Sequence, residues 1–239
     1  MLKTIIRAII PTKLLEFRDL LMRTRPLASR KCSVCKYQGY FKNAGKPPRL
    51  DALCPKCGSL ERHRLFWLWY QQHADAIKAP IMHFAPEKIF ESKFKKIYLD
   101  GYKTADLYAS ADLKINIEQI DLHDDAFNTV ICNHVLEHVD DEKALREIYR
   151  ILSHDGIFIV SVPIVEGWDK TYENPEIRTD KERELHFGQN DHVRYYGKDF
   201  RERLRSAGFK FEEITAEGSD VVEYGLLRGE KYFICSKMV

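Results

Sequence analysis

Two pairs of cysteines near the start of the chain have the spacing of a metal site. Cys32 and Cys35 form one C-x2-C pair, and Cys54 and Cys57 form a second pair after 18 intervening residues. Each pair directs two thiolates to one point, and two pairs complete a tetrahedron of sulfur ligands with no open position. The spacing therefore predicts a structural zinc site, which replaces the hydrophobic core that so short a segment cannot build.

The cysteine usage and the hydropathy pattern indicate the cellular compartment in which we expect the protein. Cys132 and Cys235 stand in apolar runs, where we expect buried thiols. Metal-type cysteine pairs without a disulfide pattern favour a reducing, cytoplasmic location. The opening MLKTIIRAII is interrupted by Arg7, is followed by Pro11 and lacks a small-residue cleavage site, so we expect neither a signal peptide nor a transmembrane segment.

Titratable residues gather in a second stretch, NTVICNHVLEHVDDEKALREIYRILSHDGIFIVSVP, residues 128–163. His134, Glu137 and His138 match H-x-x-E-H, a zinc motif of inverted zinc peptidases. That motif requires both histidines on one face of a continuous helix. Here a β-branched strand leads directly into the motif and helix signals begin only after it, so the pattern argues against a peptidase.

The same stretch predicts a strand, a loop, a helix and a second strand. Thr129–Cys132 is β-branched and apolar, Asp140 and Asp141 mark a helix start, and Gly156–Pro163 is a second apolar strand after a break at Asp155. In such β-α-β units ligands lie beyond the carboxyl ends of the strands. We therefore expect the loop 133–139 to face a binding site.

This stretch resembles the fourth and fifth strands of class I S-adenosylmethionine (SAM)-dependent methyltransferases of the type 11 group, and most closely the bacterial members that carry an N-terminal zinc ribbon. The resemblance extends over nearly the whole chain from Lys31. It implies an α/β fold with a doubly wound, Rossmann-like, seven-stranded sheet, and SAM as the methyl donor. The expected parts are a basic amphipathic arm (1–30), a zinc ribbon (31–58), an aromatic connecting helix (59–78) and a methyltransferase domain (79–239) with an acceptor-side insertion (164–197).

The resemblance also implies a set of residues that bind the donor. The first strand, Pro80–Phe84, leads into a turn that lacks the glycines usual in the wider class, although the zinc-ribbon subgroup carries the same H-x-A-P-E. In this turn Ala85 would allow close approach, while His83 or Glu87 would accept from the SAM ammonium. An acid at the end of the second strand, Tyr102–Leu107, suits the ribose hydroxyls. The implied cofactor-binding residues are His83, Phe84, Ala85, Glu87, Asp106, Leu107, Asn116, Ile117, Asn133, His134 and Val135.

The insertion is too aromatic for a disordered segment and shows no clear periodicity. We expect it to bind the acceptor, the alternative being a lid whose polar groups only satisfy one another. An acceptor that loses a proton requires a base, for which histidine has a suitable pKa. The candidates are His192 and His138, then His134 and His186; each could instead be a structural histidine.

Charge is distributed unevenly along the chain. Residues 1–66 hold 15 Lys and Arg against 4 Asp and Glu, whereas the remainder holds 23 against 32. The basic arm either docks on the domain or, over residues 1–24, lies on an anionic membrane surface. In the ribbon, basic side chains with aromatic neighbours could contact a nucleic acid, although a purely structural ribbon is favoured. These residues are Lys42, Lys46, Arg49, Tyr37, Tyr40 and Phe41.

Two functional hypotheses follow. The first is an active methyltransferase whose unidentified acceptor is a small or glycan-like molecule in preference to a nucleic acid. The second is a methyltransferase-fold scaffold without turnover that grips a partner through the ribbon and arm. The missing glycine turn favours the scaffold slightly, while Asp106, Asn116 and the 133–138 loop favour the enzyme more.

Overall fold

The computed structural model describes residues 12–23 and 25–238. The described chain forms two compact units, one made of residues up to Leu68 together with Glu217–Leu227, and one made of Trp69–Ala216 together with the residues from Arg228 onward. The sequence places 217–227 within the methyltransferase domain, yet they cluster with the ribbon. The first part of the predicted amphipathic arm, residues 1–11, lies outside the described residues.

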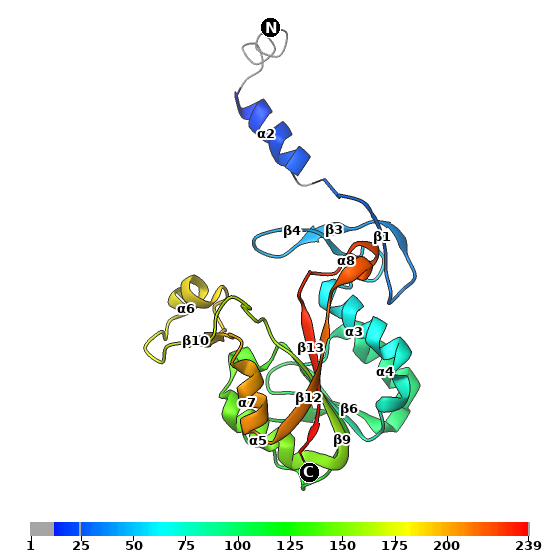
Figure 1. Ribbon diagram of the computed structural model, residues 1–239, viewed down its shortest axis with the longest axis vertical. Helices are drawn as coiled ribbons and strands as arrows, with labels where there is room; N and C mark the ends of the chain where they lie inside the picture. The colour runs from blue at the N-terminus through cyan, green and yellow to red at the C-terminus, as the bar shows by residue number, and fades with distance from the viewer. Residues whose placement is uncertain (1–11, 24, 239) are drawn as a thin grey trace. The chain divides into compact units, whose positions relative to one another are not determined.

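The first unit contains short strands joined by tight turns (Figure 1). β1 pairs with β2 and β3 with β4, both antiparallel. The cysteine pairs follow β1 and β4 directly, so each strand pair presents its thiolates from a turn. The elements are α2 (Thr12–Arg23), β1 (Ser29–Lys31), β2 (Gln38–Tyr40), β3 (Lys42–Ala44), β4 (Arg49–Leu53), α8 (Gly218–Tyr224) and the first turns of α3 (Glu61–Gln72).

Arg64 explains why 217–227 belong to this unit. The side chain is fully buried and donates to the carbonyls of Tyr224, Gly225, Ala52 and Ser59. A buried guanidinium requires such acceptors, since leaving it unpaired would be costly. Arg64 therefore joins parts of this unit through hydrogen bonds to backbone carbonyls.

Helix α2 exposes an apolar face. Leu14, Phe17 and Leu20 are each 57% exposed. Among the described residues, no helix is both long and apolar enough to span a membrane.

The second unit contains a seven-stranded sheet in the order β12-β13-β9-β8-β5-β6-β7. β5, β6, β7, β8 and β9 run parallel to one another, whereas β13 is antiparallel to both β9 and β12. This sheet confirms the predicted fold class. Its strands are β5 (Ile81–Phe84), β6 (Tyr102–Asp106), β7 (Leu113–Lys114), β8 (Phe127–Asn133), β9 (Leu152–Ser161), β12 (Phe209–Thr215) and β13 (Lys231–Lys237).

Alternating side chains on the strands form two packed layers, as a sheet covered on both faces requires. Val130 of β8 and Phe158 of β9 pack with α5 (Asp141–Ile151) and α7 (Phe200–Ser206) in the main core. On the opposite face, His83 of β5 meets Phe94 of α4 (Lys88–Tyr98). Figure 1 shows α5 and α7 on one side of the sheet and α4 on the other. The 3-10 helices η1 (Ala74–Ala76) and η2 (Leu99–Gly101) complete this part.

Helix α5 confirms the predicted start but not the predicted end. Asp140 is its N-cap and accepts from the backbone N–H of Lys143. The helix ends at Ile151 instead of at Asp155, and β9 begins at once with Leu152, which pairs with Phe127. Strand pairing therefore takes over before the glycine that the sequence suggests as the breaker.

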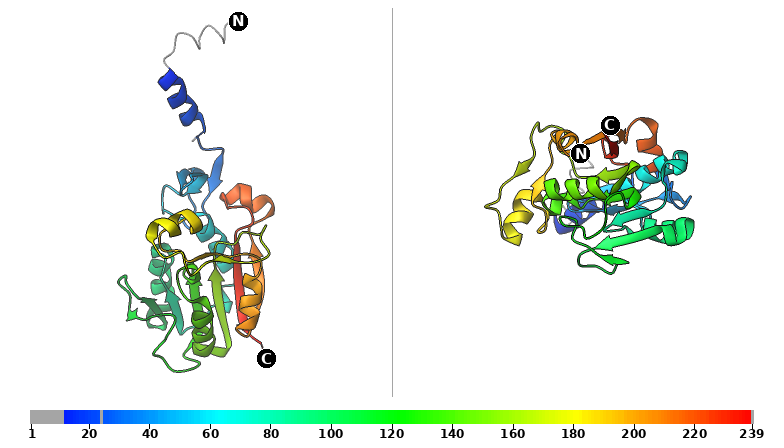
Figure 2. Two further views of the ribbon diagram at one scale, coloured as in Figure 1. Left: turned by 90° about the vertical axis from the view of Figure 1, so that its left-hand side faces the viewer. Right: turned by 90° about the horizontal axis from the view of Figure 1, so that it is seen from below.

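The insertion is more ordered than its lack of periodicity suggests. It contains α6 (Asp180–Phe187) and a two-stranded pair, β10 (Tyr172–Glu173) with β11 (Arg194–Tyr195). A capping box between Thr179 and Glu182 starts the helix, and Gly188 ends it in a left-handed conformation. Figure 2 shows this segment, in yellow, at the end of the sheet where β9 ends.

Candidate functional site

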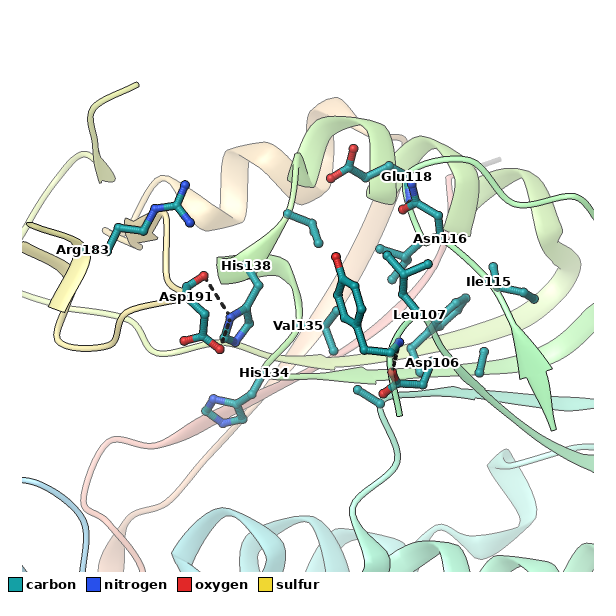
Figure 3. A pocket seen from close by; sticks show the side chains of 16 residues that line it. Asp106, Leu107, Ile115, Asn116, Glu118, His134, Val135, His138, Arg183 and Asp191 are labelled. Atoms are coloured by element: carbon teal, nitrogen blue, oxygen red, sulfur yellow. Dashed lines mark hydrogen bonds and ion pairs between the residues drawn. The ribbon is translucent and has the colours of Figure 1, made fainter. Parts of the chain in front are cut away.

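A pocket of about 550 Å³ lies at the carboxyl ends of β5, β6 and β8. From β5 the chain continues to β6 and β7 on one side of the sheet's centre, and then crosses to β8 on the other side of β5. Parallel sheets usually form a ligand-binding crevice at such a point. Figure 3 shows lining side chains from the end of β6, including Asp106 and Leu107, and from the loop after β8, including His134 and Val135. The pocket is lined by Phe84, Ala85, Ala105, Asp106, Leu107, Tyr108, Ile115, Asn116, Ile117, Glu118, His134, Val135, His138, Val139, Arg183 and Asp191.

Ala85 takes the backbone conformation that a glycine usually supplies. Its φ is +44°, and its N–H donates to the carbonyl of Ala105 at 2.8 Å. A left-handed conformation costs an L-residue about 1–2 kcal/mol. The turn after β5 therefore keeps a glycine-like path without a glycine, and the strain lies at the wall of the pocket.

Asp106 and Asn116 are each fixed by a local backbone contact. Oδ1 of Asp106 accepts from the N–H groups of Tyr108 at 2.7 Å and Ala109 at 2.6 Å, and Oδ1 of Asn116 accepts from the N–H of Glu118 at 3.0 Å. Within the described chain, the second carboxylate oxygen of Asp106 and the amide nitrogen of Asn116 have no hydrogen-bond partner. Both side chains are thus positioned and still offer one polar atom each.

Three of the predicted cofactor residues lie away from the pocket lining. His83 is fully buried, with Nε2 facing Glu87 at 3.1 Å and Nδ1 facing the hydroxyl of Tyr102 at 2.8 Å. Glu87 is the partner of His83 and does not line the pocket either. Asn133 lies below the surface, where its Oδ1 accepts from Ser161 at 3.3 Å. The other eight predicted residues line the pocket.

The candidate histidines separate into two groups. His134 and His138 line the pocket, and His192 lies buried behind His138 with 4.6 Å between ring centroids. His186 is exposed on α6, where its Nδ1 is 2.7 Å from the hydroxyl of Tyr172, outside the pocket lining. The structure therefore brings three of the four together.

Glu137 stands at the centre of these histidines. It is 1% exposed, on the 3-10 helix η3 (Leu136–His138), and its Oε1 is 3.2 Å from Nδ1 of His134. Burial alone would raise the pKa of the carboxyl, but the hydrogen bond and charge of His134 outweigh it, so the pKa lies below the usual value. Burial also lowers the pKa of His192, which favours a neutral ring near pH 7.

The conformation of this loop differs from that of the peptidase motif. His134 has a φ of +53°, and helical geometry covers only Leu136–His138. The two histidines of H-x-x-E-H therefore do not lie on one continuous helix. This agrees with the sequence, in which helix signals begin only after the motif.

The insertion holds the loop in place from the other side. The N–H of Val193 donates to the carbonyl of Glu137 at 2.9 Å, and Arg194 donates to the carbonyls of Leu136 at 2.8 Å and Val139 at 2.6 Å. Arg194 also pairs with Glu173 at 2.8 Å. This wall of the pocket is thus formed by two segments that lie far apart in sequence.

Sequence reasoning missed three charged residues of the pocket, Glu118, Arg183 and Asp191. Glu118 accepts from the N–H of Asp140, and Asp191 contacts His138. Asp191 is adjacent to His192, which the sequence already suggests as a candidate base, and this adjacency is the local signal that could have indicated Asp191. The other two reach the pocket through tertiary contacts that no short motif marks.

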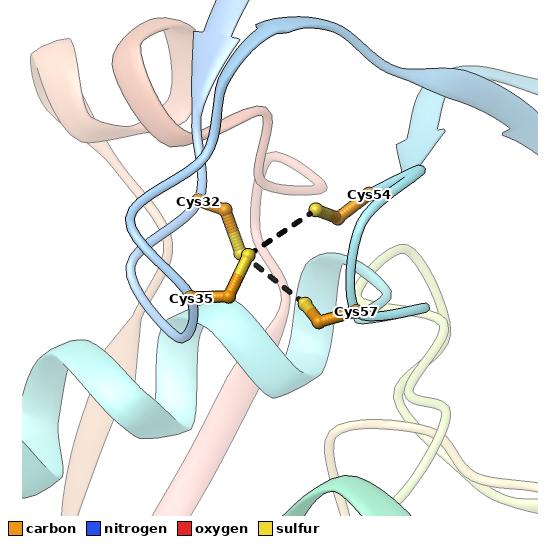
Figure 4. A group of neighbouring side chains, drawn as sticks. All are labelled: Cys32, Cys35, Cys54 and Cys57. Atoms are coloured by element: carbon orange, nitrogen blue, oxygen red, sulfur yellow. Dashed lines mark hydrogen bonds between the residues drawn. The ribbon is translucent and has the colours of Figure 1, made fainter.

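The four cysteines form a compact cluster in the first unit (Figure 4). Sγ of Cys32 is 3.6 Å from Sγ of Cys57, and Sγ of Cys35 is 3.7 Å from Sγ of Cys54. A tetrahedral zinc ion with zinc–sulfur bonds of ~2.3 Å separates its sulfurs by ~3.8 Å. The cluster therefore has the dimensions of a closed four-thiolate zinc site.

Comparison with known families identifies the central part of the second unit. Residues 99–160 match the model of a family described as a methyltransferase domain. This range contains Asp106, Asn116 and His134. Among curated proteins, none matches the chain.

Solved structures resemble the chain at low identity. A SAM-dependent methyltransferase from Mesorhizobium loti is 14% identical, with a TM-score of 0.51, over 73% of this chain and 98% of that one. A SAM-dependent methyltransferase from Archaeoglobus fulgidus is 12% identical, with a TM-score of 0.49, over 77% and 96%. The 1,6-didemethyltoxoflavin-N1-methyltransferase of Burkholderia thailandensis, solved with S-adenosylhomocysteine, is 16% identical, with a TM-score of 0.44, over 70% and 73%. The first of these likenesses shows the fold.

Proposed function

Because the chain carries a methyltransferase domain with the class I fold, we propose that it transfers a methyl group from SAM to an acceptor bound beneath the insertion. The observation that carries this proposal is the convergence of Asp106, Asn116 and His134 on one pocket at the carboxyl ends of the parallel strands.

The residues of the pocket suit a nucleoside-bearing donor. A volume of about 550 Å³ falls within the usual range for small-molecule sites, ~300–1,000 Å³. The unpaired oxygen of Asp106 suits a ribose hydroxyl, and the amide of Asn116 suits the polar edge of adenine. Phe84, Leu107, Ile117 and Val135 supply the apolar walls on which an adenine ring and a thioether chain can pack.

Methyl transfer from SAM requires the protein mainly to align the acceptor with the methyl group. SAM supplies a methyl group that is already activated by the sulfonium. The chain must hold the acceptor in line and keep water out, and we expect the insertion and the 134–139 loop to do this. For an acceptor that loses a proton, His134 and His138 are the imidazoles that reach the pocket, and His192 supports His138 from behind.

The charges of the lining favour a small or glycan-like acceptor over a nucleic acid. Apart from Asp106, which is assigned to the donor, two carboxylates, Glu118 and Asp191, line the pocket against one guanidinium, Arg183. A phosphate backbone requires cationic partners, and this balance of charge would repel it.

Isothermal titration calorimetry with S-adenosylhomocysteine tests the proposal. We expect the full chain to bind it, and Asp106→Ala to weaken binding by roughly 10–100-fold, since hydrogen bonds to a charged group contribute ~1.5–3 kcal/mol. Asp100→Ala, at an exposed acid outside the pocket, is the matched control and should bind as the parent does. Equal affinity of the two variants would refute the ribose assignment, and no binding by the parent would refute the proposal.

The four-cysteine cluster adds a second part to the proposal, a structural zinc ion. Thiolates at these separations leave no open position for a substrate or water, so the ion would stabilise the first unit and take no part in methyl transfer.

The scaffold alternative retains one favourable observation, the basic charge of residues 1–66 together with the exposed ring of Tyr40 (63%) in the ribbon. Salt-sensitive binding of RNA or DNA by a chain that fails to bind S-adenosylhomocysteine would favour it.

A further inference from the structure

Beside the pocket, three side chains of metal-binding type converge on one point. One ligand atom each from Glu137, His138 and His192 lies within 4.8 Å of the other two. Glu137 is 1% exposed and His192 is 3% exposed, so the cluster is built into the interior and is not a chance gathering of surface groups.

Two atoms of this cluster are buried without a partner. Among residues 12–23 and 25–238, neither Oε2 of Glu137 nor Nδ1 of His192 has a hydrogen-bond partner. An unsatisfied buried polar atom costs ~1–3 kcal/mol, and such atoms commonly indicate an ion or water that belongs there. Here both atoms belong to residues whose side chains ligate metals.

The neighbouring contacts orient the ligands as a metal site requires. Nδ1 of His138 faces two acceptors of Asp191, the backbone oxygen at 3.2 Å and a carboxylate oxygen at 3.3 Å. Nδ1 must therefore carry a proton, which leaves the lone pair on Nε2. Likewise Oε1 of Glu137 is held by Nδ1 of His134, so that Oε2 remains available. Hydrogen bonds of this kind fix the tautomer and orientation of metal ligands.

We propose that Glu137, His138 and His192 bind a divalent transition-metal ion. Two imidazoles and one carboxylate form a donor set that prefers zinc, iron, cobalt or nickel over calcium and magnesium. Three protein ligands leave open positions, unlike the four-cysteine cluster.

The ion would lie at the acceptor-side wall of the pocket, because His138 lines both the pocket and the cluster. The open positions would then hold an oxygen of the acceptor, and His134 would be the remaining candidate for the base, since a metal-bound His138 has no free lone pair. This consequence favours a hydroxylated acceptor and rests on the proposed methyl transfer, whereas the metal site itself does not.

Total metal content after equilibrium dialysis of the full chain against Co²⁺ tests the site, with cobalt and zinc counted together by mass spectrometry. We expect two ions per parent chain and one per chain in His138→Ala and His192→Ala, with affinity at the second site lowered at least ~100-fold. His186→Ala removes an exposed histidine of the same insertion and should keep two. The second ion should show the weak absorption of cobalt bound by nitrogen and oxygen, without the strong charge-transfer bands of thiolate ligands.

His138→Ala is the decisive variant, because its side chain is 28% exposed and we expect its removal to leave the core intact. One ion in the parent chain, or two in His138→Ala, would overturn the proposal. Since no donor or acceptor is present in the dialysis, a negative result leaves the methyl-transfer proposal standing, and failure to bind S-adenosylhomocysteine leaves the metal site standing.

Discussion

The four-cysteine cluster and the cluster of Glu137, His138 and His192 both consist of side chains that can bind metals, yet they are built in opposite ways. Each cysteine pair spans four consecutive residues, and both pairs emerge from turns after short strands. The second cluster joins Glu137 and His138 to His192 of the insertion, whose neighbour Val193 donates to the carbonyl of Glu137. As proposed, the cysteine site would be closed and would support its own unit, while the second site would be open and borders a pocket.

Because of this difference, we expect the four-cysteine site to affect the stability of the first unit and the Glu137 cluster to affect ligand binding. The thiolate site would replace the hydrophobic core of a short segment, so its loss should unfold the first unit. The open cluster depends on a fold that already exists, so its loss should remove a ligand and leave the fold in place. The following variants test this contrast, in order of decreasing effect.

The largest effect is expected from Cys54→Ser. Structural zinc contributes an apparent ~10–16 kcal/mol of binding free energy to small domains of this kind. The variant should therefore lose one metal ion and the unfolding transition of the first unit, as measured by metal analysis and circular dichroism. Cys235→Ala, which removes a buried thiol of β13 apart from the cluster, should keep the metal. Unchanged metal content and folding in Cys54→Ser would contradict a structural zinc site.

Arg194→Ala should have the next largest effect. Its removal leaves the carbonyls of Leu136 and Val139 without their donor and takes one partner from Asp141, which is 2% exposed. We expect a loss of about 2–4 kcal/mol in the free energy of unfolding, measured by chemical denaturation of the second unit. Arg178→Ala, at an exposed arginine of the same insertion, is the control. Equal losses would show that the insertion does not fix the loop.

Ala85→Gly should act in the opposite direction. Relief of a left-handed conformation, worth ~1–2 kcal/mol, exceeds the ~0.5–1 kcal/mol that glycine adds to the entropy cost of folding. We therefore expect a gain of about 0.5 kcal/mol in the free energy of unfolding. Ala105→Gly, in regular β6 structure, should instead destabilise the fold. Destabilisation by both glycines would mean that Ala85 carries no strain.

The smallest effect concerns pH and Glu173, which pairs with Arg194 and Arg203. Burial acts to raise the pKa of this carboxyl, but the two guanidinium groups outweigh it, so the pKa lies below its usual value of 4.5. Its contribution to stability is therefore present above pH ~4.5 and is lost as the pH falls through the lower pKa of the folded state.

Glu173→Gln should accordingly reduce the free energy of unfolding by less than about 1 kcal/mol at pH 7, because the carboxylate is partly exposed. The difference from the parent should shrink below pH ~4.5. Glu176→Gln, at an exposed carboxylate of the same segment, should show no such convergence. A constant difference across the pH range would exclude the ion pair as its source.

The contrast between local and long-range contacts also explains which features of the structure the sequence predicts. Thr129–Cys132 as a strand, Asp140 as a cap and the four cysteines as one cluster follow from signals within a few residues, and the structure has all three. The seven-stranded sheet is likewise confirmed.

Features that depend on distant contacts were not predictable. The burial of Arg64 depends on carbonyl partners, two of which, on Tyr224 and Gly225, lie far away in sequence. Glu118 and Arg183 reach the pocket from segments without any motif, and strand pairing of Leu152 ends α5 early. The roles of Asp106, Asn116 and the histidines stay predictions, since placement in a pocket is not yet binding.

A crystal structure of the chain grown with S-adenosylhomocysteine tests the central claim most directly. The account predicts the nucleoside in the pocket, with its ribose hydroxyls on Asp106 and its adenine edge near Asn116. Density for the ligand at another place, or a pocket that closes around Asp106 when the ligand is in excess, would contradict it.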